Sequence, residues 1–377
     1  MPRKTVFVYD DALSRHLLSD SHPMKPERLR YTYELLDSYQ AFAPEQSALV
    51  PPRPATEEEI LQFHTPDYLS AVQRLSVEGQ SVSDPRFNFG PGDNPAYPGM
   101  YEAASYSTGA SLRAVEALLS GEADAAFSIS GGLHHAMPGY AYGFCVFNDP
   151  VIAIQRLVSE GMKVAYVDID CHHGDGVQHA FYDTDAVLTI SMHESGAFLF
   201  PGTGFTQETG AGRGRGYAVN IPLYPYTSDE VYLWAFRETV LPLVERFRPD
   251  VLVTQLGIDS HFRDPITHLA LTTQGHNAVV REFSAMAPPK WLALGGGGYD
   301  LQAVARAWTM DYGVMSGLEF ANEIPGPYRA TYQVESLRDD GELPIKQSVV
   351  DETREFAEDS VRSVQGLLFP AHGILSA

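Results

Sequence analysis

The sequence contains only two cysteines, Cys145 and Cys171, among its 377 residues. A disulfide framework requires several cysteines in a short chain, so we expect both thiols to be reduced. The sequence also lacks an apolar run long enough to cross a membrane. Its first residues lead directly into a strand-like segment and do not resemble a signal peptide. These absences predict a soluble, cytoplasmic protein that has no membrane partner.

Basic residues are also few. There are 26 Lys and Arg residues against 48 Asp and Glu residues, which gives a formal net charge of −22. Binding to nucleic acid requires a basic surface, so we expect no nucleic-acid partner. An acidic surface can attract a basic substrate, although solubility alone explains most of these charges. The hydrophobic content of 44% is typical of a globular protein with a sizeable core.

Strand-like apolar segments alternate with helical patterns along most of the chain. The strand candidates are 4–9, 124–130, 163–169, 186–192, 217–221, 250–256 and 290–295, and the helical patterns include 103–119, 151–160 and 229–247. Such alternation predicts an α/β fold with a largely parallel sheet and helices on both faces. We expect one domain over 1–377, with a catalytic core at about 5–310. The C-terminal extension at about 320–377 contains loops and an amphipathic helix near 352–368.

The most informative stretch runs from Tyr166 to Gly176, directly after a strand-like segment. Alternate side chains of a strand share a face, so Asp168, Asp170 and His172 can point the same way. Two carboxylates and one imidazole suit a divalent ion such as zinc. A single aspartate at a strand end is more often a helix cap, but the whole run favours a catalytic metal site. Asp259, which follows the segment 250–256, is the candidate third ligand, and Asp264-Pro265 reads as a turn.

Two adjacent histidines, His134 and His135, follow another strand-like segment and two glycines. A neutral histidine can serve as a general base or acid near pH 7. Each would need a carboxylate to orient it, and Asp168 and Asp175 are the available candidates.

Four glycines, 295–298, precede Tyr299. The segment lacks the Lys-Ser/Thr pair of a phosphate-binding loop. Bare backbone instead allows Tyr299 to reach into the site, where its phenol can donate a hydrogen bond to a developing oxyanion. Phe144 and Phe200 flank the chemistry in sequence. They form either a slot for an aliphatic side chain or ordinary core contacts.

Taken together, these segments resemble the histone deacetylase family. The matching stretches occur in the family's order: 22–28, 131–135, 143–149, 168–176, 200–204, the Asp259 segment and 295–300. Within the family, 93–104 and 264–269 are similar to the bacterial acetoin-utilization deacetylases, which are class I-like. The resemblance implies the arginase–deacetylase fold with a central, mainly parallel sheet of eight strands.

The resemblance also implies roles for individual residues. Zinc, or ferrous iron, would be held by Asp170, His172 and Asp259. His134 would pair with Asp168 and His135 with Asp175, while Tyr299 would face the carbonyl. The implied substrate contacts are Phe144, Phe200 and Gly143 in the tunnel, Asp93 at the rim and Arg28 at the inner end. Potassium would occupy one site at Asp168, Asp170, His172, Ser191 and Met192, and a second at Phe181, Thr184, Val187 and Tyr217.

The implied activity is removal of acetyl groups from lysine in proteins, and an acetylated metabolic enzyme such as an acyl-CoA synthetase is the suggested partner. An acetylpolyamine amidohydrolase and a non-enzymatic reader of acyl-lysine are alternatives. A binuclear manganese ureohydrolase is a further alternative, but Gly257 stands where it would need another ligand. His261 and Arg263, which follow Asp259, depart from the family pattern and are expected to alter the rim.

Overall fold

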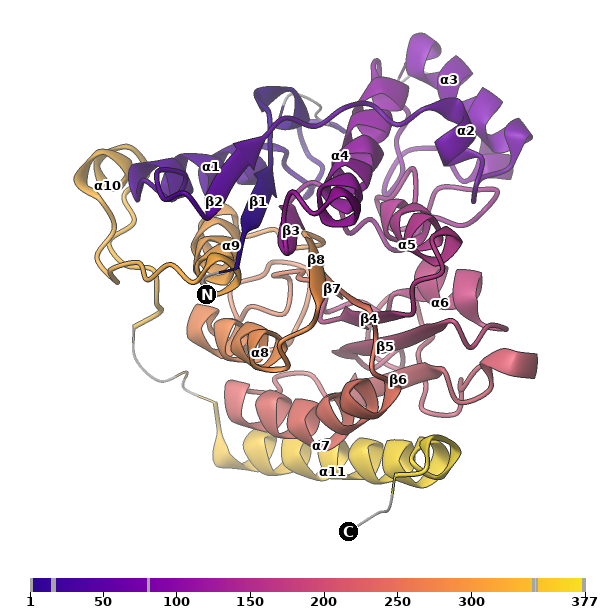
Figure 1. Ribbon diagram of the computed structural model, residues 1–377, viewed down its shortest axis with the longest axis vertical. Helices are drawn as coiled ribbons and strands as arrows, with labels where there is room; N and C mark the ends of the chain where they lie inside the picture. Colours follow the sequence, from indigo (N-terminus) through magenta and orange to yellow (C-terminus); the bar gives the residue numbers. More distant parts are fainter. Residues whose placement is uncertain (1–2, 15–17, 80–81, 341–342, 344, 375–377) are drawn as a thin grey trace.

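An eight-stranded sheet runs through the centre of the molecule (Figure 1). The computed structural model describes residues 3–14, 18–79, 82–340, 343 and 345–374. The strand order is β2-β1-β3-β8-β7-β4-β5-β6, and every neighbouring pair is parallel. The strands are β1 Thr5–Val8, β2 Ser47–Val50, β3 Ala125–Ser128, β4 Val164–Asp168, β5 Val187–Glu194, β6 Ala218–Leu223, β7 Val251–Gln255 and β8 Lys290–Leu294. The expected eight-stranded α/β architecture is therefore confirmed.

Most strands are continuous apolar runs because both faces of the sheet are covered. Every residue of β4 and β7 is buried, for example. Each of the seven strand candidates overlaps one observed strand, although β5 and β6 extend two residues beyond the C-terminal ends of their candidates. The remaining strand, β2, was not predicted, because it is a short edge strand whose two central residues, Ala48 and Leu49, are exposed.

Helices pack on both faces of the sheet (Figure 1). α4, α5 and α6 cover one face, while α1, α9, α8 and α7 form the opposite layer and α11 lies against α7 and β6. The helices are α1 Glu27–Ser38, α2 Glu57–Ile60, α3 Pro66–Glu78, α4 Met100–Ser120, α5 Asp149–Ser159, α6 Asp175–Phe181, α7 Asp229–Phe247, α8 Thr273–Ala285, α9 Leu301–Ser316, α10 Gly326–Tyr332 and α11 Gln347–Leu368.

Helix caps fix where the chain turns near the ends of the strands. The Asn148 side chain accepts the N–H of Val151 and begins α5. Asp300 accepts the N–H groups of Gln302 and Ala303 and begins α9, directly after Tyr299. Such caps satisfy N–H groups that have no partner within the helix. They therefore fix the backbone at the C-terminal ends of the histidine-bearing and glycine-rich loops.

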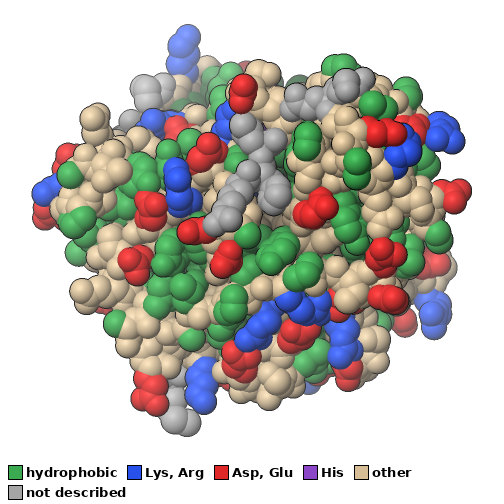
Figure 2. Space-filling model, turned by 90° about the horizontal axis from the view of Figure 1, so that it is seen from above, with side chains coloured by type: hydrophobic (Ala, Val, Ile, Leu, Met, Phe, Trp, Pro, Cys, Tyr) green, Lys and Arg blue, Asp and Glu red, His purple; other side chains and the backbone are tan. Residues whose placement is uncertain are grey.

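The C-terminal part contains the expected amphipathic helix. α11 starts five residues before the predicted 352–368 segment and ends at the same residue. The expected single domain, 1–377, also includes 1–2, 15–17, 80–81, 341–342, 344 and 375–377, which lie outside the described residues. None of the described helices is long and apolar enough to cross a membrane. On the face seen in Figure 2, most Lys and Arg side chains stand among Asp and Glu side chains.

Candidate active site

The candidate residues gather at the C-terminal ends of four neighbouring strands, which is where ligands bind in open α/β sheets. In sheet order these strands are β3, β8, β7 and β4. The histidine pair follows β3, Tyr299 follows β8, Asp259 follows β7, and the run from Asp168 to His172 ends β4. The topology therefore unites segments that lie far apart in the sequence.

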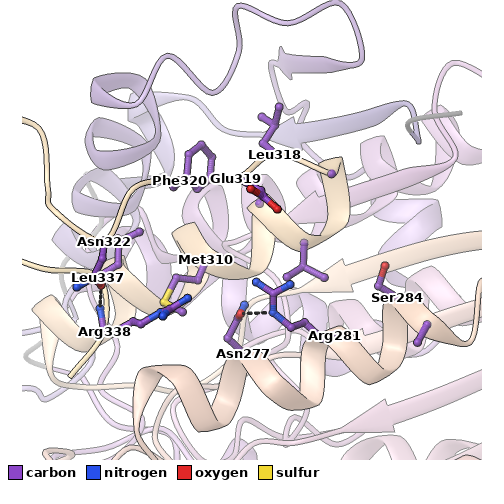
Figure 3. A pocket seen from close by; sticks show the side chains of 14 residues that line it. Asn277, Arg281, Ser284, Met310, Leu318, Glu319, Phe320, Asn322, Leu337 and Arg338 are labelled. Atoms are coloured by element: carbon purple, nitrogen blue, oxygen red, sulfur yellow. Dashed lines mark hydrogen bonds between the residues drawn. The ribbon is translucent and has the colours of Figure 1, made fainter. Parts of the chain in front are cut away.

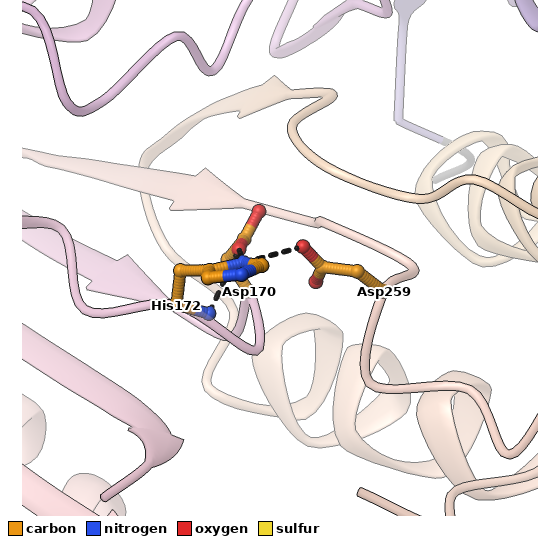
Figure 4. A group of neighbouring side chains, drawn as sticks. All are labelled: Asp170, His172 and Asp259. Atoms are coloured by element: carbon orange, nitrogen blue, oxygen red, sulfur yellow. Dashed lines mark hydrogen bonds and ion pairs between the residues drawn. The ribbon is translucent and has the colours of Figure 1, made fainter. Parts of the chain in front are cut away.

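Asp170, His172 and Asp259 converge on one point (Figure 4). The Nδ1 atom of His172 lies 2.9 Å from Oδ2 of Asp259 and 3.2 Å from Oδ1 of Asp170. All three side chains are buried, and one ligand atom from each lies within 4.8 Å of the others. Among the described residues, this is the one group of three such side chains that meets this distance criterion.

The remaining carboxylate oxygens are held by donors from the protein. Oδ2 of Asp170 accepts hydrogen bonds from the Gln255 side chain at 2.7 Å and the Gly297 N–H at 2.8 Å. Oδ1 of Asp259 accepts the N–H of Cys171 at 2.7 Å. These contacts aim one oxygen of each carboxylate at His172. Sequence reasoning missed Gln255, which gives no local signal because it is the last residue of a buried strand.

The electrostatics of this group suit a divalent cation. Burial and the charge of Asp170 raise the pKa of Asp259 to about 6. Burial opposes protonation of His172, but its hydrogen bonds to the two carboxylates outweigh burial and raise its pKa to about 10. In the absence of a cation, the positive charge of His172 therefore offsets the two carboxylates. Since buried charges require such compensation, the donor set fits zinc or a similar ion.

His134 and His135 form a linked pair beside this group. Nδ1 of His134 lies 2.7 Å from Oδ2 of Asp168, and Nδ1 of His135 lies 2.6 Å from Oδ1 of Asp175. The two Nε2 atoms are 3.0 Å apart. The structure thus brings together both of the histidine–carboxylate pairs implied by the resemblance.

The two histidines differ in charge. Burial disfavours the charged form of His134, but Asp168 and Asp170 outweigh it and raise the pKa of His134 to about 9. The pKa of His135 is lowered by burial and by the charge of His134. His135 is therefore neutral at neutral pH and can accept a proton, while His134 carries a positive charge.

Tyr299 sits on a loop whose glycines adopt conformations that other residues rarely take, with φ of 127° at Gly296 and 125° at Gly298. The backbone N–H of Tyr299 donates to Oδ2 of Asp264 at 2.9 Å. Burial raises the pKa of the Tyr299 phenol well above its usual value, so the hydroxyl keeps its proton. Asp264 also accepts the N–H of Ile266, as its interpretation as a turn residue predicts. The sequence did not predict the hydrogen bond between Asp264 and the Tyr299 N–H.

Phe144 and Phe200 lie next to this chemistry. The Phe144 ring contacts Tyr299 with centroids 5.8 Å apart, and the Phe200 ring lies 5.1 Å from that of His135. Gly143 has a φ of 50°, and a Cβ atom there would lie 2.4 Å from the His135 ring. Glycine is therefore required at this position for the backbone to approach the histidine.

The two expected ends of the tunnel differ in exposure. Asp93 is exposed, and its carbonyl oxygen lies 3.2 Å from Nε2 of His22. Arg28 is buried, donates to the carbonyl oxygen of Gly298 at 3.1 Å and stacks on Trp308. Arg28 lines a cavity of about 100 Å³. Met24 and Leu133 line both this cavity and the small pocket that contains Asp170 and His172.

The residues expected to bind potassium lie around β4 and β5. Asp168 ends β4, Asp170 and His172 follow it, and Ser191 and Met192 lie in the C-terminal half of β5. Phe181, Thr184, Val187 and Tyr217 surround the start of β5. The Thr184 N–H donates to Phe181, and the Thr189 N–H donates to Tyr217. Potassium binding at both places stays a prediction.

Two further expectations can be compared with the structure. His261 does not alter the rim, because it is buried and its Nε2 lies 2.9 Å from Oδ2 of Asp339. Arg263 is half exposed, and its Nε lies 3.2 Å from Oδ2 of Asp300. At Gly257, a Cβ atom would lie 2.2 Å from Oδ2 of Asp170. The position therefore has no room for the further ligand that a binuclear site would need.

A separate cleft of about 560 Å³ lies between α8 and the end of α9 (Figure 3). Arg281, Glu319 and Arg338 are among its lining residues. It includes none of the candidate catalytic residues, whereas the small pocket at the strand ends is lined by His134, His135, Asp170, His172 and Tyr299.

Comparisons with known proteins agree with this geometry. The family model described as the histone deacetylase domain matches residues 22–315. The acetoin utilization protein AcuC of Bacillus subtilis is 40% identical over 339 residues, covering 88% of this chain and 87% of that protein. Histone deacetylase 1 of Homo sapiens is 39% identical over 326 residues, covering 86% of this chain and 67% of that protein.

Solved structures show the same similarity. A histone deacetylase homologue complexed with SAHA superimposes with a TM-score of 0.83 and 32% identity, covering 94% of this chain and 100% of that one. A homologue from Aquifex aeolicus gives a TM-score of 0.83 with 31% identity over the same shares.

Proposed function

This chain belongs to the histone deacetylase family, and from that membership we propose that it is a zinc-dependent amidohydrolase that removes acetyl groups from the ε-amino group of lysine in proteins. The observation that carries the proposal is the convergence of His172 Nδ1 with one oxygen each of Asp170 and Asp259, beside the His134–His135 pair. Ferrous iron would suit the same ligands.

A divalent cation held by Asp170, His172 and Asp259 would polarise the amide carbonyl and acidify water. The neutral His135 takes a proton from water at Nε2 and later delivers it to the leaving amine. Asp175 holds Nδ1 of His135 and so fixes the direction of its Nε2 atom. The products are acetate and a free lysine amine.

Two other residues stabilise the negative charge that develops during the reaction. His134, which is positively charged beside Asp168, supplies a fixed charge next to the reacting atoms. Tyr299 donates a hydrogen bond from its protonated hydroxyl to the oxygen on which negative charge develops, and such donors contribute about 100- to 1,000-fold in turnover. Phe144 and Phe200 enclose the aliphatic stem of the acyl-lysine.

The proposal extends to the rest of the chain. Residues 1–377 form a single catalytic domain in a cytoplasmic protein, potassium binds near β4 and β5, and Asp93 contacts the substrate backbone at the rim. The natural substrate is an acetylated protein, such as a metabolic enzyme of the acyl-CoA synthetase type. The formal charge of −22 favours one alternative, an acetylpolyamine amidohydrolase, which would use the same chemistry on a small polycation.

The test measures acetate release from an acetyl-lysine peptide by the purified protein. Release should stop with a chelator and return with added zinc. The variant Tyr299→Phe should lower turnover by about 100-fold or more and retain the bound metal. Tyr312→Phe is the matched control, because its buried hydroxyl contacts Ser47 at the N-terminal end of β2, whereas the candidate site lies at the C-terminal ends of the strands. Chelator-insensitive release, or full turnover by Tyr299→Phe, would contradict the mechanism.

A further inference from the structure

Tyr140 and Tyr142 lie on one side of a segment whose backbone is held by several hydrogen bonds. Tight turns flank it, since Met137 and Tyr140 exchange backbone hydrogen bonds, as do Tyr142 and Cys145. Between the two tyrosines, Ala141 is fully buried and bonded through its backbone to Phe87 and to the Asn88 side chain. Because successive side chains of an extended segment alternate, both tyrosine rings face away from the buried Ala141.

These rings continue the wall of the active site to the surface. The Tyr142 ring packs on Phe200 with centroids 4.8 Å apart, and Phe200 in turn contacts His135. The Tyr140 ring meets that of Tyr142 edge to face at 6.0 Å. Tyr140 is 40% exposed, and Tyr142 is partly buried. An unbroken series of aromatic rings therefore leads from the histidine pair to solvent.

Acidic side chains lie close to the Tyr140 and Tyr142 rings. Asp93 precedes Asn94, whose side chain accepts the N–H of Phe144, two residues after Tyr142, at 3.0 Å. Asp175 lies 2.6 Å from the His135 ring that Phe200 contacts. Burial raises the pKa of Tyr142, and the charges of Asp175 and Asp93 raise it further. Asp93 itself is exposed. Arg263, near Tyr299, has its charge paired with Asp300. Aromatic faces beside a carboxylate attract cations. An acetylated lysine side chain is neutral, so any cation recognised here belongs to another part of the substrate.

We propose that Tyr140, Tyr142 and Asp93 form a subsite for a cationic group that neighbours the acylated amine. The inference rests on the proposed amidohydrolase function and adds a substrate preference to it. The cation can be the side chain of a neighbouring arginine or lysine in a protein, or an ammonium group of a polyamine. Both sources share the chemistry that the subsite recognises.

The test compares pairs of substrates in which one member carries positive charge that its counterpart lacks. Acetyl-lysine peptides carry either arginine or citrulline, its neutral isostere, directly before or after the acetyl-lysine. Acetylspermidine and N-acetylhexylamine form the second pair. For at least one pair, the wild-type kcat/KM should be about five-fold higher for the cationic member. The pair with the larger ratio identifies whether the cation comes from a peptide or a polyamine.

Variants assign that preference to the subsite. Tyr140→Leu and Tyr142→Leu should bring the ratio close to one, whereas Tyr140→Phe, which keeps the aromatic face, should preserve it. Tyr226→Leu is the matched control, because Tyr226 is an exposed aromatic residue on another loop, with its ring next to His268. It should leave the ratio unchanged.

Two results would overturn the inference. One is a wild-type ratio near one in every pair, and the other is a ratio that persists in both leucine variants. Hydrolysis of the neutral members would show in either case that the amidohydrolase itself is intact. No hydrolysis of any substrate with zinc present would instead refute the proposed function, and the inference with it.

Discussion

The side chain of Asp264 accepts the backbone N–H of Tyr299 through Oδ2 at 2.9 Å, across 35 residues of sequence. Tyr299 follows four glycines, two of which have strongly positive φ angles, and such backbone is intrinsically free to move. Asp264 is itself held, because its second oxygen accepts the N–H of Ile266. This contact fixes where the Tyr299 hydroxyl lies, so Asp264 is a positioning residue for the proposed oxyanion donor.

Replacing Asp264 should therefore impair turnover more than substrate binding. Asp264→Ala leaves the Tyr299 N–H without its partner and should lower kcat by about 10- to 100-fold, with KM and bound zinc nearly unchanged. Asp264→Asn keeps an oxygen acceptor and should lose less. Steady-state kinetics and metal analysis on both variants make the comparison. Equal kcat in Asp264→Ala and the wild type would refute the positioning role.

The pH dependence of kcat/KM should be bell-shaped. Activity should fall at acidic pH as His135, whose pKa lies below its usual value, gains a proton. It should fall again on the alkaline side as His134, with a pKa of about 9, loses its charge. A bound divalent cation adds positive charge and moves both limbs to lower pH. The two limbs belong to the linked pair rather than to either histidine alone.

The variant Asp168→Asn tests whether loss of the His134 charge causes the alkaline limb. It removes the charge that most raises the pKa of His134, so the alkaline limb should move to lower pH while the acidic limb shifts less. The measurement is the pH profile of kcat/KM for the wild type and the variant. An alkaline limb that does not move would mean that another group controls it.

Metal removal should destabilise the fold. Without a cation, the buried Asp170 and Asp259 are left with the charges of His172 and of His134, whose Nε2 lies 3.8 Å from Oδ1 of Asp170. Zinc binds the folded state, and at 100 times its Kd it should add about 2.7 kcal/mol to the free energy of unfolding. Thermal denaturation should therefore show a lower Tm with chelator and recovery with zinc. His172→Asn should abolish the response, whereas His372→Asn, at a buried histidine bonded to Gly216, should retain it.

Asp339 should contribute to stability in a pH-dependent way. Its carboxylate lies 2.9 Å from Nε2 of His261 and 2.8 Å from Nη2 of Arg306, and it accepts the Thr273 N–H. Burial opposes ionisation, but these partners hold its pKa well below the usual value. Its stabilisation is therefore present above the unfolded pKa of about 4 and is lost as the pH falls through the folded value.

Asp339→Asn should lower the free energy of unfolding at pH 7 by about 1 kcal/mol, since the site is partly exposed and solvent weakens the interaction. The difference from the wild type should shrink below pH 4. Urea denaturation at several pH values measures it, with the exposed neighbour Asp340→Asn as the control. A difference that does not change with pH would rule out the charge as its cause.

Much of the fold follows from local patterns. Strands such as β4 and β7 were predictable because both of their faces are buried, which leaves continuous apolar runs. β2 was not predicted, because half of its short length is exposed at the sheet edge. The count of eight strands and the fold family came from the resemblance, since periodicity does not give strand order.

The sequence likewise predicts some residues of the candidate site and not others. Asp170 and His172 lie in one contiguous motif, so their residue types and spacing predict a metal site. Asp264 and Gln255 act through hydrogen bonds to Tyr299 and Asp170, at sequence separations of 35 and 85 residues. No local pattern encodes such contacts. His261 was assigned to the rim from its place in the sequence, but a tertiary contact with Asp339 holds it in the interior.

The strand order also bears on how the protein is made. β8 lies between β3 and β7 and hydrogen-bonds to both, although it is the last strand in the chain. All three proposed metal ligands leave the ribosome before β8 does, because they end at residue 259. Tyr299 follows them, together with Gly297, whose N–H bonds to Asp170. A nascent chain therefore carries the complete set of metal ligands before it carries the group that would complete the catalytic site.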